Sequence, residues 1–265
     1  MLFIVMVIGL TVFLTVLIIF SLLEFFFAKM MGRPFVIYTH LKLRKLSRVQ
    51  HEYLLSKFTC YGKLNQRKQR IFGHRLLQFI DNKEFVSRGG FEITESVKLL
   101  ICGTAVMLTF GMRRYLMTSV RRFIIYPDKY DSILNRAEHI GEYNPALKII
   151  VFSWKDFMKG YEIENDNLNL AVHEFAHALT YDNMKIKDGG GILFSDGLFK
   201  IDQLLKSPGF SKKLHNTNYF RDYAKVNKYE FFAVSLEHYV ETPNTFSKEF
   251  PILYKIISQM LNYQF

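Results

Sequence analysis

Two histidines and a glutamate occupy the segment "NLAVHEFAHALTY", which runs from Asn169 to Tyr181. On a helix, His173 and His177 lie one turn apart on the same face, with Cβ atoms about 6 Å apart. Both imidazoles can therefore reach one tetrahedral zinc ion at the usual Zn–N distance of about 2.0–2.1 Å. Glu174 is rotated by about 100° from His173, so its carboxylate can take a proton from a metal-bound water. The His-Glu-x-x-His spacing predicts a zinc-dependent hydrolase.

A catalytic zinc ion needs a third protein ligand, which leaves a fourth position for water. The longer motif H-E-x-x-H-x-x-G-x-x-H is absent, because Thr180 and Asn183 stand where glycine and histidine are required. The next glutamate along the chain is Glu230, and Glu237 follows seven residues later on the same face of an amphipathic segment. One carboxylate can bind the metal while the other orients a ligand histidine, and spacing alone leaves the choice open. Other candidate ligands are Asp182, Asp196, Asp202 and His215.

The flanking sequence predicts the elements that position these side chains. Asp166 or Asn167 is expected to cap the histidine helix, whose apolar stripe consists of Leu168, Ala171, Val172, Phe175 and Leu179. The β-branched and aromatic runs "RRFIIYP" and "LKIIVFSW" predict strands, and "KDGGGILFSDG" predicts a glycine-rich loop. Further helices are expected in "LNQRKQRIFGHRLLQFIDNKEF", after Thr94, in "NKYEFFAVSLEHYV", and in "PILYKIISQMLNY" with Pro251 near its first turn. The fold class is therefore α+β, mainly helical with a small sheet.

The chain of 265 residues is 49% hydrophobic, enough for one substantial core. Cys60 and Cys102 are too few for a disulfide framework or a zinc knuckle. The net charge of +11 is local, because Lys29 to Arg75 contain twelve basic residues and one acid, while the rest of the chain has 23 of each. Since this basic block matches no nucleic-acid-binding motif, we expect no nucleic acid partner.

An uncharged run of 22 residues, Leu2 to Leu23, opens the chain. As a helix it reaches about 33 Å, enough for a hydrocarbon core of about 30 Å. A signal peptide is the alternative, but a basic leading region and an A-x-A-like cleavage site are absent. The basic residues that follow favour a cytoplasmic body. The second apolar run, Leu99 to Met112, has fourteen residues and suits a core helix. We predict an anchor (1–26), a basic juxtamembrane connector (27–57) and a catalytic domain (58–265).

Five blocks in order resemble the Mlc titration factor A (MtfA) family of zinc-dependent peptidases. They are "SRGGFEIT", "RRFIIYP", "IIVFSW", "VHEFAHAL" and "YEFFAVSLEHYVETPNTFSKEFPILY", and the similarity covers about Phe58 to Tyr254. The last two blocks are also similar to the catalytic domain of anthrax lethal factor, which shares the gluzincin arrangement. The resemblance implies a gluzincin-type domain with one zinc ion per chain. It also implies that "IIVFSW" is the strand before the active-site helix, equivalent to an edge strand that pairs with substrate.

Carried onto this sequence, the resemblance implies specific roles. His173, His177 and Glu230 would bind zinc, because the glutamate that leads "EFFA" is the family's third ligand. Glu174 would be the general base, and Tyr223, seven residues before Glu230, would stabilise the oxyanion. Glu237 would then contact a ligand histidine or lie exposed on its helix. Lethal factor has a further glutamate where this chain has Val234.

These features predict a membrane-anchored zinc metallopeptidase that hydrolyses peptide bonds in peptide or protein substrates. We expect one span in the lipid bilayer, in a bacterial inner membrane, with the catalytic domain in the cytoplasm. The alternative is a zinc-stabilised binding module that sequesters a transcriptional regulator or another partner at the membrane, with weak or vestigial hydrolysis. Membrane-embedded quality-control metallopeptidases fit less well, because they usually need more spans and an apolar sequence around the motif.

Overall fold

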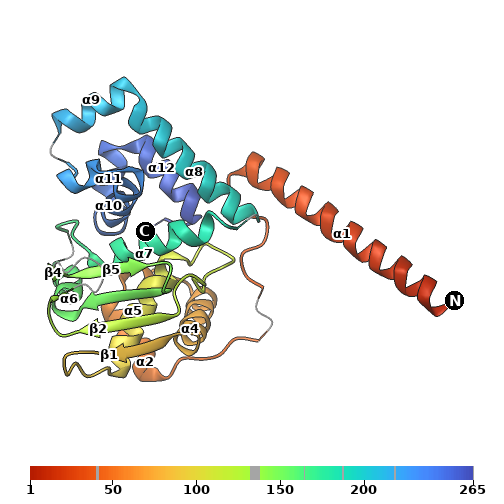
Figure 1. Ribbon diagram of the computed structural model, residues 1–265, viewed down its shortest axis with the longest axis horizontal. Coiled ribbons are helices and arrows are strands. Elements are labelled where there is room, and N and C mark those ends of the chain that lie inside the picture. Colours follow the sequence, from red (N-terminus) through yellow and green to blue (C-terminus); the bar gives the residue numbers. More distant parts are fainter. Residues whose placement is uncertain (40–41, 132–137, 164, 187, 218, 265) are drawn as a thin grey trace.

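The computed structural model describes residues 1–265 except 40–41, 132–137, 164, 187, 218 and 265, and except the side chains of residues 223 and 225. Helix α1 projects from a body made of helices and a small mixed sheet (Figure 1). The predicted α+β class is confirmed. The helices are α1 (Leu2–Met31), α2 (Arg48–Lys57), α3 (Thr59–Gly62), α4 (Gln66–Asp81), α5 (Glu95–Leu108), α6 (Trp154–Glu162), α7 (Leu170–Asn183), α8 (Gly189–Lys206), α9 (Pro208–Asn216), the 3-10 helix η1 (Asp222–Lys225), α10 (Lys228–Glu241), α11 (Pro243–Glu249) and α12 (Pro251–Leu261). The strands are β1 (Glu84–Ser87), β2 (Arg122–Tyr126), β3 (Tyr130–Asp131), β4 (Glu138–His139), β5 (Gly141–Asn144) and β6 (Ile149–Ser153).

The main sheet has the strand order β1-β2-β6-β5. Strands β1, β2 and β6 are parallel, and β5 runs antiparallel to β6 at one edge. Both predicted strands are present, as β2 and β6. The expectation that "IIVFSW" forms an edge strand is wrong, because β6 lies between β2 and β5. The edge belongs to β5, whose sequence "GEYN" lacks the β-branched residues that mark a strand.

Aromatic packing fixes the histidine helix on this sheet. Phe175 of α7 meets Phe123 of β2 at a ring-centroid distance of 5.9 Å and Phe152 of β6 at 6.1 Å. All three side chains are fully buried. Helix α5, which contacts α4 and α7, is buried from Leu99 to Leu108, so the second apolar run forms a core helix, as its length predicts. These contacts hold one face of α7 in the core, and His173 on another face points toward α10.

Two local predictions are wrong, and side-chain caps explain both. Helix α7 begins later than expected, because Asn169 Oδ1 accepts a hydrogen bond from Val172 N at 3.1 Å. Neither Asp166 nor Asn167 caps it, and Leu168 is 52% exposed, outside the stripe. The glycine-rich segment is helical, because the side chain of Asp188 accepts hydrogen bonds from two backbone amides at the start of α8.

Helix α1 is the one helix in the described part of the chain that is long and apolar enough to cross a membrane. No residue of its most apolar window is buried, and signal sequences also meet this criterion. The other end of α1 is docked. Glu24 is buried and accepts hydrogen bonds from Arg113, and Lys29 lies 3.2 Å from Asp196 of α8. The helix therefore continues from its free apolar part into contact with the body.

Candidate metal centre and active site

Helices α7 and α10 pack against each other and bring three side chains together. His173 and His177 come from the middle of α7, and Glu230 comes from the first turn of α10. The start of α10 is fixed by Asn227, whose Oδ1 accepts hydrogen bonds from Tyr229 N at 2.8 Å and Glu230 N at 3.1 Å. This cap places Glu230 opposite the two histidines, although it lies more than fifty residues further along the chain.

The ligand atoms of His173, His177 and Glu230 all lie within 4.8 Å of one another. The two histidine Nε2 atoms are 3.2 Å apart, and Glu230 approaches them at 3.2 Å and 3.6 Å. Two atoms bound to one tetrahedral zinc at about 2.0–2.1 Å are separated by about 3.3 Å. In addition, Glu230 Oε2 is buried without a hydrogen-bond partner among the described residues. Two imidazole nitrogens and a buried carboxylate oxygen that converge in this way fit a metal cation.

Glu237 lies on the other side of His173. Its side chain is buried, and its Oε1 accepts a hydrogen bond from His173 Nδ1 at 2.8 Å. Its Oε2 accepts from Asn169 N at 2.9 Å. Arg221 donates to both oxygens, from Nη2 at 2.6 Å and from Nη1 at 3.1 Å. Of the two carboxylates that the spacing left open, Glu230 faces the metal position and Glu237 holds a histidine.

A family profile described as glucose-regulated metallo-peptidase M90 matches residues 37–262. The chain belongs to this family. The MtfA-like resemblance is therefore confirmed, and the match includes part of the connector before α2. None of the curated proteins matches the chain. Membership indicates a metallopeptidase-type protein that acts on peptides or proteins, and the cluster of His173, His177 and Glu230 supplies a candidate metal site.

The M90 site is electrostatically arranged for a positive charge. Burial disfavours the charged form of His173, but its interactions with Glu230 and Glu237 outweigh burial and raise its pKa to about 9. Burial likewise disfavours the Glu230 carboxylate, yet His173 and His177 hold its pKa well below the usual range. The cluster therefore stabilises a proton between its members. A metal cation would take the place of that proton.

Glu174 shares a cavity of about 570 Å³ with His173 and Arg221. Its carboxylate is buried, and this burial raises its pKa, while the neighbouring histidines act in the opposite direction. Gly141 of β5 faces it closely, since a Cβ atom there would lie 3.2 Å from Glu174 Oε1 and 2.5 Å from Leu170 Cδ1. Glycine at this position lets the sheet edge approach both α7 and the carboxylate.

The other candidates of the sequence lie in different contacts. Asp182 accepts a hydrogen bond from Ser119 N at 2.9 Å. Asp196 forms ion pairs with two lysines, and Asp202 forms one with a single lysine. His215 contacts a backbone oxygen of its own helix. None of them belongs to the metal cluster among the described residues. Tyr223 lies in η1, but its side chain is outside the described part of the structure, so its role stays a prediction. Arg221 was missed, because nothing in the sequence pairs it with Glu237.

Proposed function

We propose that this M90 peptidase hydrolyses peptide bonds with one zinc ion held by His173, His177 and Glu230. The observation that supports it is the convergence of three ligand atoms within 4.8 Å, beside a cavity that His173 and Glu174 line. Two imidazoles and one carboxylate form a common donor set for catalytic zinc, with a position left open. When bound, zinc supplies Lewis-acid polarisation of a carbonyl and lowers the pKa of a water to about 7.

Glu174 is the proposed general base. In this role it takes a proton from the attacking water and returns it to the leaving amine. Its burial raises its pKa, which suits a carboxylate that must hold a proton between two steps. Tyr223 is proposed to donate a hydrogen bond to the developing oxyanion, on the family pattern of a tyrosine seven residues before the third ligand.

The sheet edge beside Glu174 suggests how a substrate binds. Among the described residues, strand β5 pairs with β6 alone, and Gly141 at its start lies against Glu174. An extended peptide can pair with such an edge through main-chain hydrogen bonds. We therefore propose that substrates bind as an added strand on β5, and not on "IIVFSW", the segment for which the family resemblance implied an edge strand.

We propose that α1 anchors the peptidase in a bacterial inner membrane, with residues 1–26 as anchor, 27–57 as connector and 58–265 as a cytoplasmic catalytic domain. The apolar stretch ends at Glu24, which accepts a hydrogen bond from Arg113. The basic residues that follow favour a cytoplasmic location for the rest of the chain. A protein partner at the membrane, such as a transcriptional regulator, belongs to the binding-module alternative.

The test measures zinc content and peptide hydrolysis together on the full chain in an uncharged detergent. Wild type and Glu174→Gln are expected to hold one zinc per chain, Glu230→Ala none, and only wild type should hydrolyse a peptide library. Glu249→Gln, an exposed change, is the matched control. Zinc retained by Glu230→Ala would refute the ligand set. Zinc bound by wild type without hydrolysis of any peptide would favour the binding module.

A further inference from the structure

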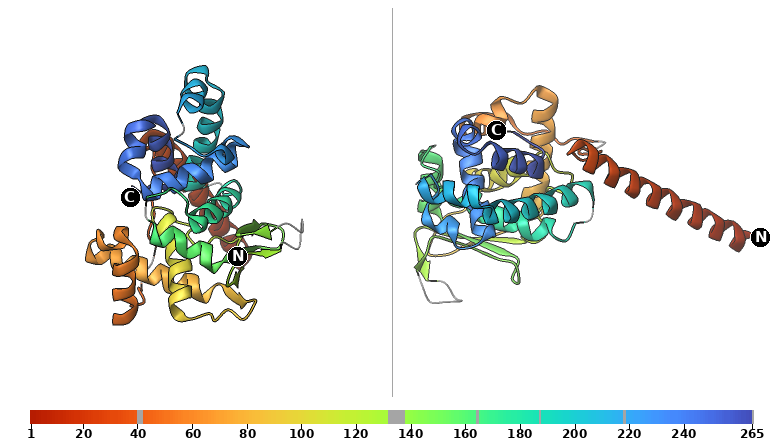
Figure 2. Two further views of the ribbon diagram at one scale, coloured as in Figure 1. Left: turned by 90° about the vertical axis from the view of Figure 1, so that its left-hand side faces the viewer. Right: turned by 90° about the horizontal axis from the view of Figure 1, so that it is seen from above.

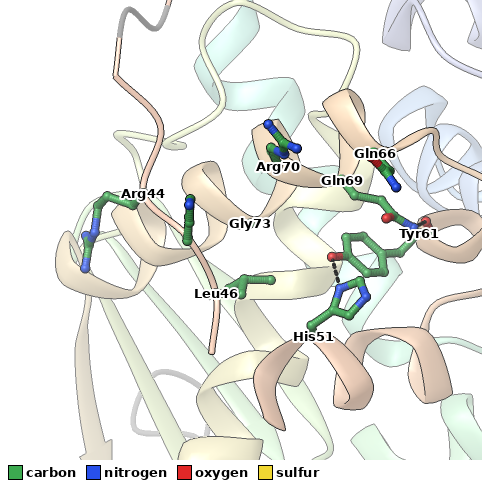
Figure 3. Close-up of a pocket in the computed structure, with 9 residues that line it drawn as sticks. Arg44, Leu46, His51, Tyr61, Gln66, Gln69, Arg70 and Gly73 are labelled. Atoms are coloured by element: carbon green, nitrogen blue, oxygen red, sulfur yellow. Dashed lines mark hydrogen bonds between the residues drawn. The ribbon is translucent and has the colours of Figure 1, made fainter. Parts of the chain in front are cut away.

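A second cavity, of about 420 Å³, lies between the connector and the first turns of α4. We call it the connector cavity, and Lys45, Arg70, His51, Tyr61, Gln69 and Arg44 contribute to its lining. Figure 3 shows Gln69 of α4 beside Tyr61, which contacts His51, and Arg70 on the same helix. None of these residues takes part in the metal cluster or lines the cavity at Glu174.

The walls of the connector cavity are held in place by specific contacts. Leu46 of the connector rests on Gly73 of α4, where a Cβ atom would lie 2.7 Å from Leu46 Cγ. The backbone amide of Arg44 donates to His74 Nδ1 at 3.0 Å, and the Arg44 guanidinium pairs with Asp81. On the other side, His51 Nδ1 lies 2.7 Å from the hydroxyl of Tyr61. Residues 42–47 of the connector are thus fixed along α4 although they form no helix or strand.

The charges around the connector cavity are unbalanced. Three of its lining side chains are cationic, and no carboxylate among the described residues lines it. Asp81 pairs with Arg44, but Lys45 and Arg70 form no ion pair within the described part of the chain. The Gln69 amide and the His51–Tyr61 pair add polar groups to the same wall. A cavity of this kind suits a small anion with several oxygen acceptors, such as a phosphate group.

The position of the connector cavity indicates where such an anion would come from. After α1, the chain runs along the side of the body from which α1 projects and then passes along α4 (Figure 1). Figure 2 gives two further views of the same arrangement. Because Glu24–Arg113 and Lys29–Asp196 dock the last turns of α1, this side of the body is held next to the end of the apolar helix. In a membrane-anchored chain, it faces the lipid headgroups.

We propose that the connector cavity binds the phosphate of an anionic phospholipid headgroup, through Lys45 and Arg70. The proposal rests on the proposed membrane anchor and cytoplasmic orientation, because the cytoplasmic leaflet carries anionic lipids that attract basic residues. Bound lipid would fix the rotation of the body about α1. The entrance to the zinc site would then keep a constant orientation toward the bilayer.

The experiment uses the full chain in micelles of an uncharged detergent. Dihexanoyl phosphatidylglycerol, dihexanoyl phosphatidylcholine and inorganic phosphate are titrated into it separately, and isothermal titration calorimetry measures each binding affinity. We expect phosphatidylglycerol to bind at least tenfold more tightly than phosphatidylcholine. The double variant Lys45→Ala/Arg70→Ala should weaken it by roughly thirtyfold, because each basic residue contributes to attraction by anionic lipid. Both side chains are exposed, so the fold should be unaffected.

The matched control is Arg88→Ala/Lys212→Ala, which removes the same two charges from exposed positions outside the cavity. It should change phosphatidylglycerol binding less than twofold. Equal weakening in both double variants would refute a defined site, and equal binding of the two lipids would refute the preference for an anion. Inorganic phosphate that binds as tightly as phosphatidylglycerol would refute the lipid assignment in favour of a soluble phosphate ligand. Alkaline carbonate extraction from membranes tests the anchor separately, and both double variants should stay membrane-bound.

Discussion

Glu237 Oε1 accepts a hydrogen bond from His173 Nδ1 at 2.8 Å. Because a carboxylate only accepts, this contact places a ring proton on Nδ1 and leaves Nε2, which faces Glu230 and His177, as the nitrogen that can bind a metal once its own proton is displaced. The backbone amide of Asn169, the cap of α7, donates to the other oxygen of Glu237. One carboxylate therefore fixes both the tautomer of a ligand histidine and the start of its helix.

Replacing Glu237 by glutamine should weaken zinc binding by about 10–100-fold, the usual effect of losing a carboxylate that orients a ligand histidine. The measurement is competition against a chelator with known zinc affinity. Glu241→Gln is a matched control on the same helix, because burial raises the pKa of Glu241 to about 7 and its neutral form is already populated near neutral pH. If both variants bind zinc like wild type, Glu237 does not orient His173 in the loaded protein.

Arg221 compensates the buried charge of Glu237 with two hydrogen bonds, at 2.6 Å and 3.1 Å. Arg221→Ala leaves that carboxylate poorly paired, so we expect a loss of about 1–3 kcal/mol in the free energy of unfolding. Arg221→Lys should restore only part of it, since an ammonium group cannot form the same fork. Denaturant unfolding with chelator present checks this without a metal contribution. Full rescue by lysine would show that charge alone matters, and the geometry of the pair does not.

Local patterns in the sequence could predict the parts of the site that lie within one element. His173, Glu174 and His177 follow from helical spacing, and β2 and β6 follow from their β-branched residues. Arg221 and Glu237 could not be paired this way, because two helices must pack before the side chains meet. The start of α7 was misplaced for the same reason, since Asn169 is held by Glu237, 68 residues away. The glycines of α8 are helical because the Asp188 cap and tertiary contacts override their low propensity.

Gly141→Ala tests how closely β5 must approach the active site. The added methyl group would lie 2.5 Å from Cδ1 at the end of the half-buried Leu170 side chain, which can rotate away, so we expect a stability loss at the low end of about 1–3 kcal/mol. Because the same methyl faces Glu174, we expect a lower kcat/KM for peptide hydrolysis with zinc content unchanged. Gly90→Ala is a control for the loss of a glycine. Its added methyl group meets open space, and its φ of 75° means that the substitution strains only the local backbone. Equal activity losses in the two variants would rule out a local effect of Gly141.

His238 predicts a pH dependence of stability. Burial, with a smaller contribution from Arg221, lowers its pKa to about 4. The unfolded chain therefore binds this proton between about pH 6.5 and 4, while the folded protein does not, so the contribution to stability falls as pH decreases through that range. His238→Phe keeps an aromatic ring against Tyr219, 4.6 Å away. Between pH 7 and 4.5 the variant should gain about 2–3 kcal/mol relative to wild type.

Chemical unfolding of both proteins at several pH values measures the difference in their free energies of unfolding. The contributions of other titrating groups, such as Glu241, cancel in this difference. Burial raises the pKa of Glu241, so its contribution has the opposite sign, and wild type alone cannot isolate His238. A difference that stays constant with pH would mean that His238 is protonated in the folded protein, or that its pKa is not lowered.

The pair between Glu24 and Arg113 predicts how α1 is held. Glu24 is buried at the end of the apolar helix, and Arg113 contacts both of its oxygens. Arg113→Ala leaves Glu24 without its cationic partner, and breaking a buried pair from one side costs about 3–5 kcal/mol. Because the described ion pairs that dock α1 lie in its last turns, this loss should release the helix end while the body stays folded. Trypsin cleavage after Lys29 should then become faster at an unchanged melting temperature of the body. Arg114→Ala, which removes an exposed neighbour paired with Asp188, is the control and should leave cleavage unchanged.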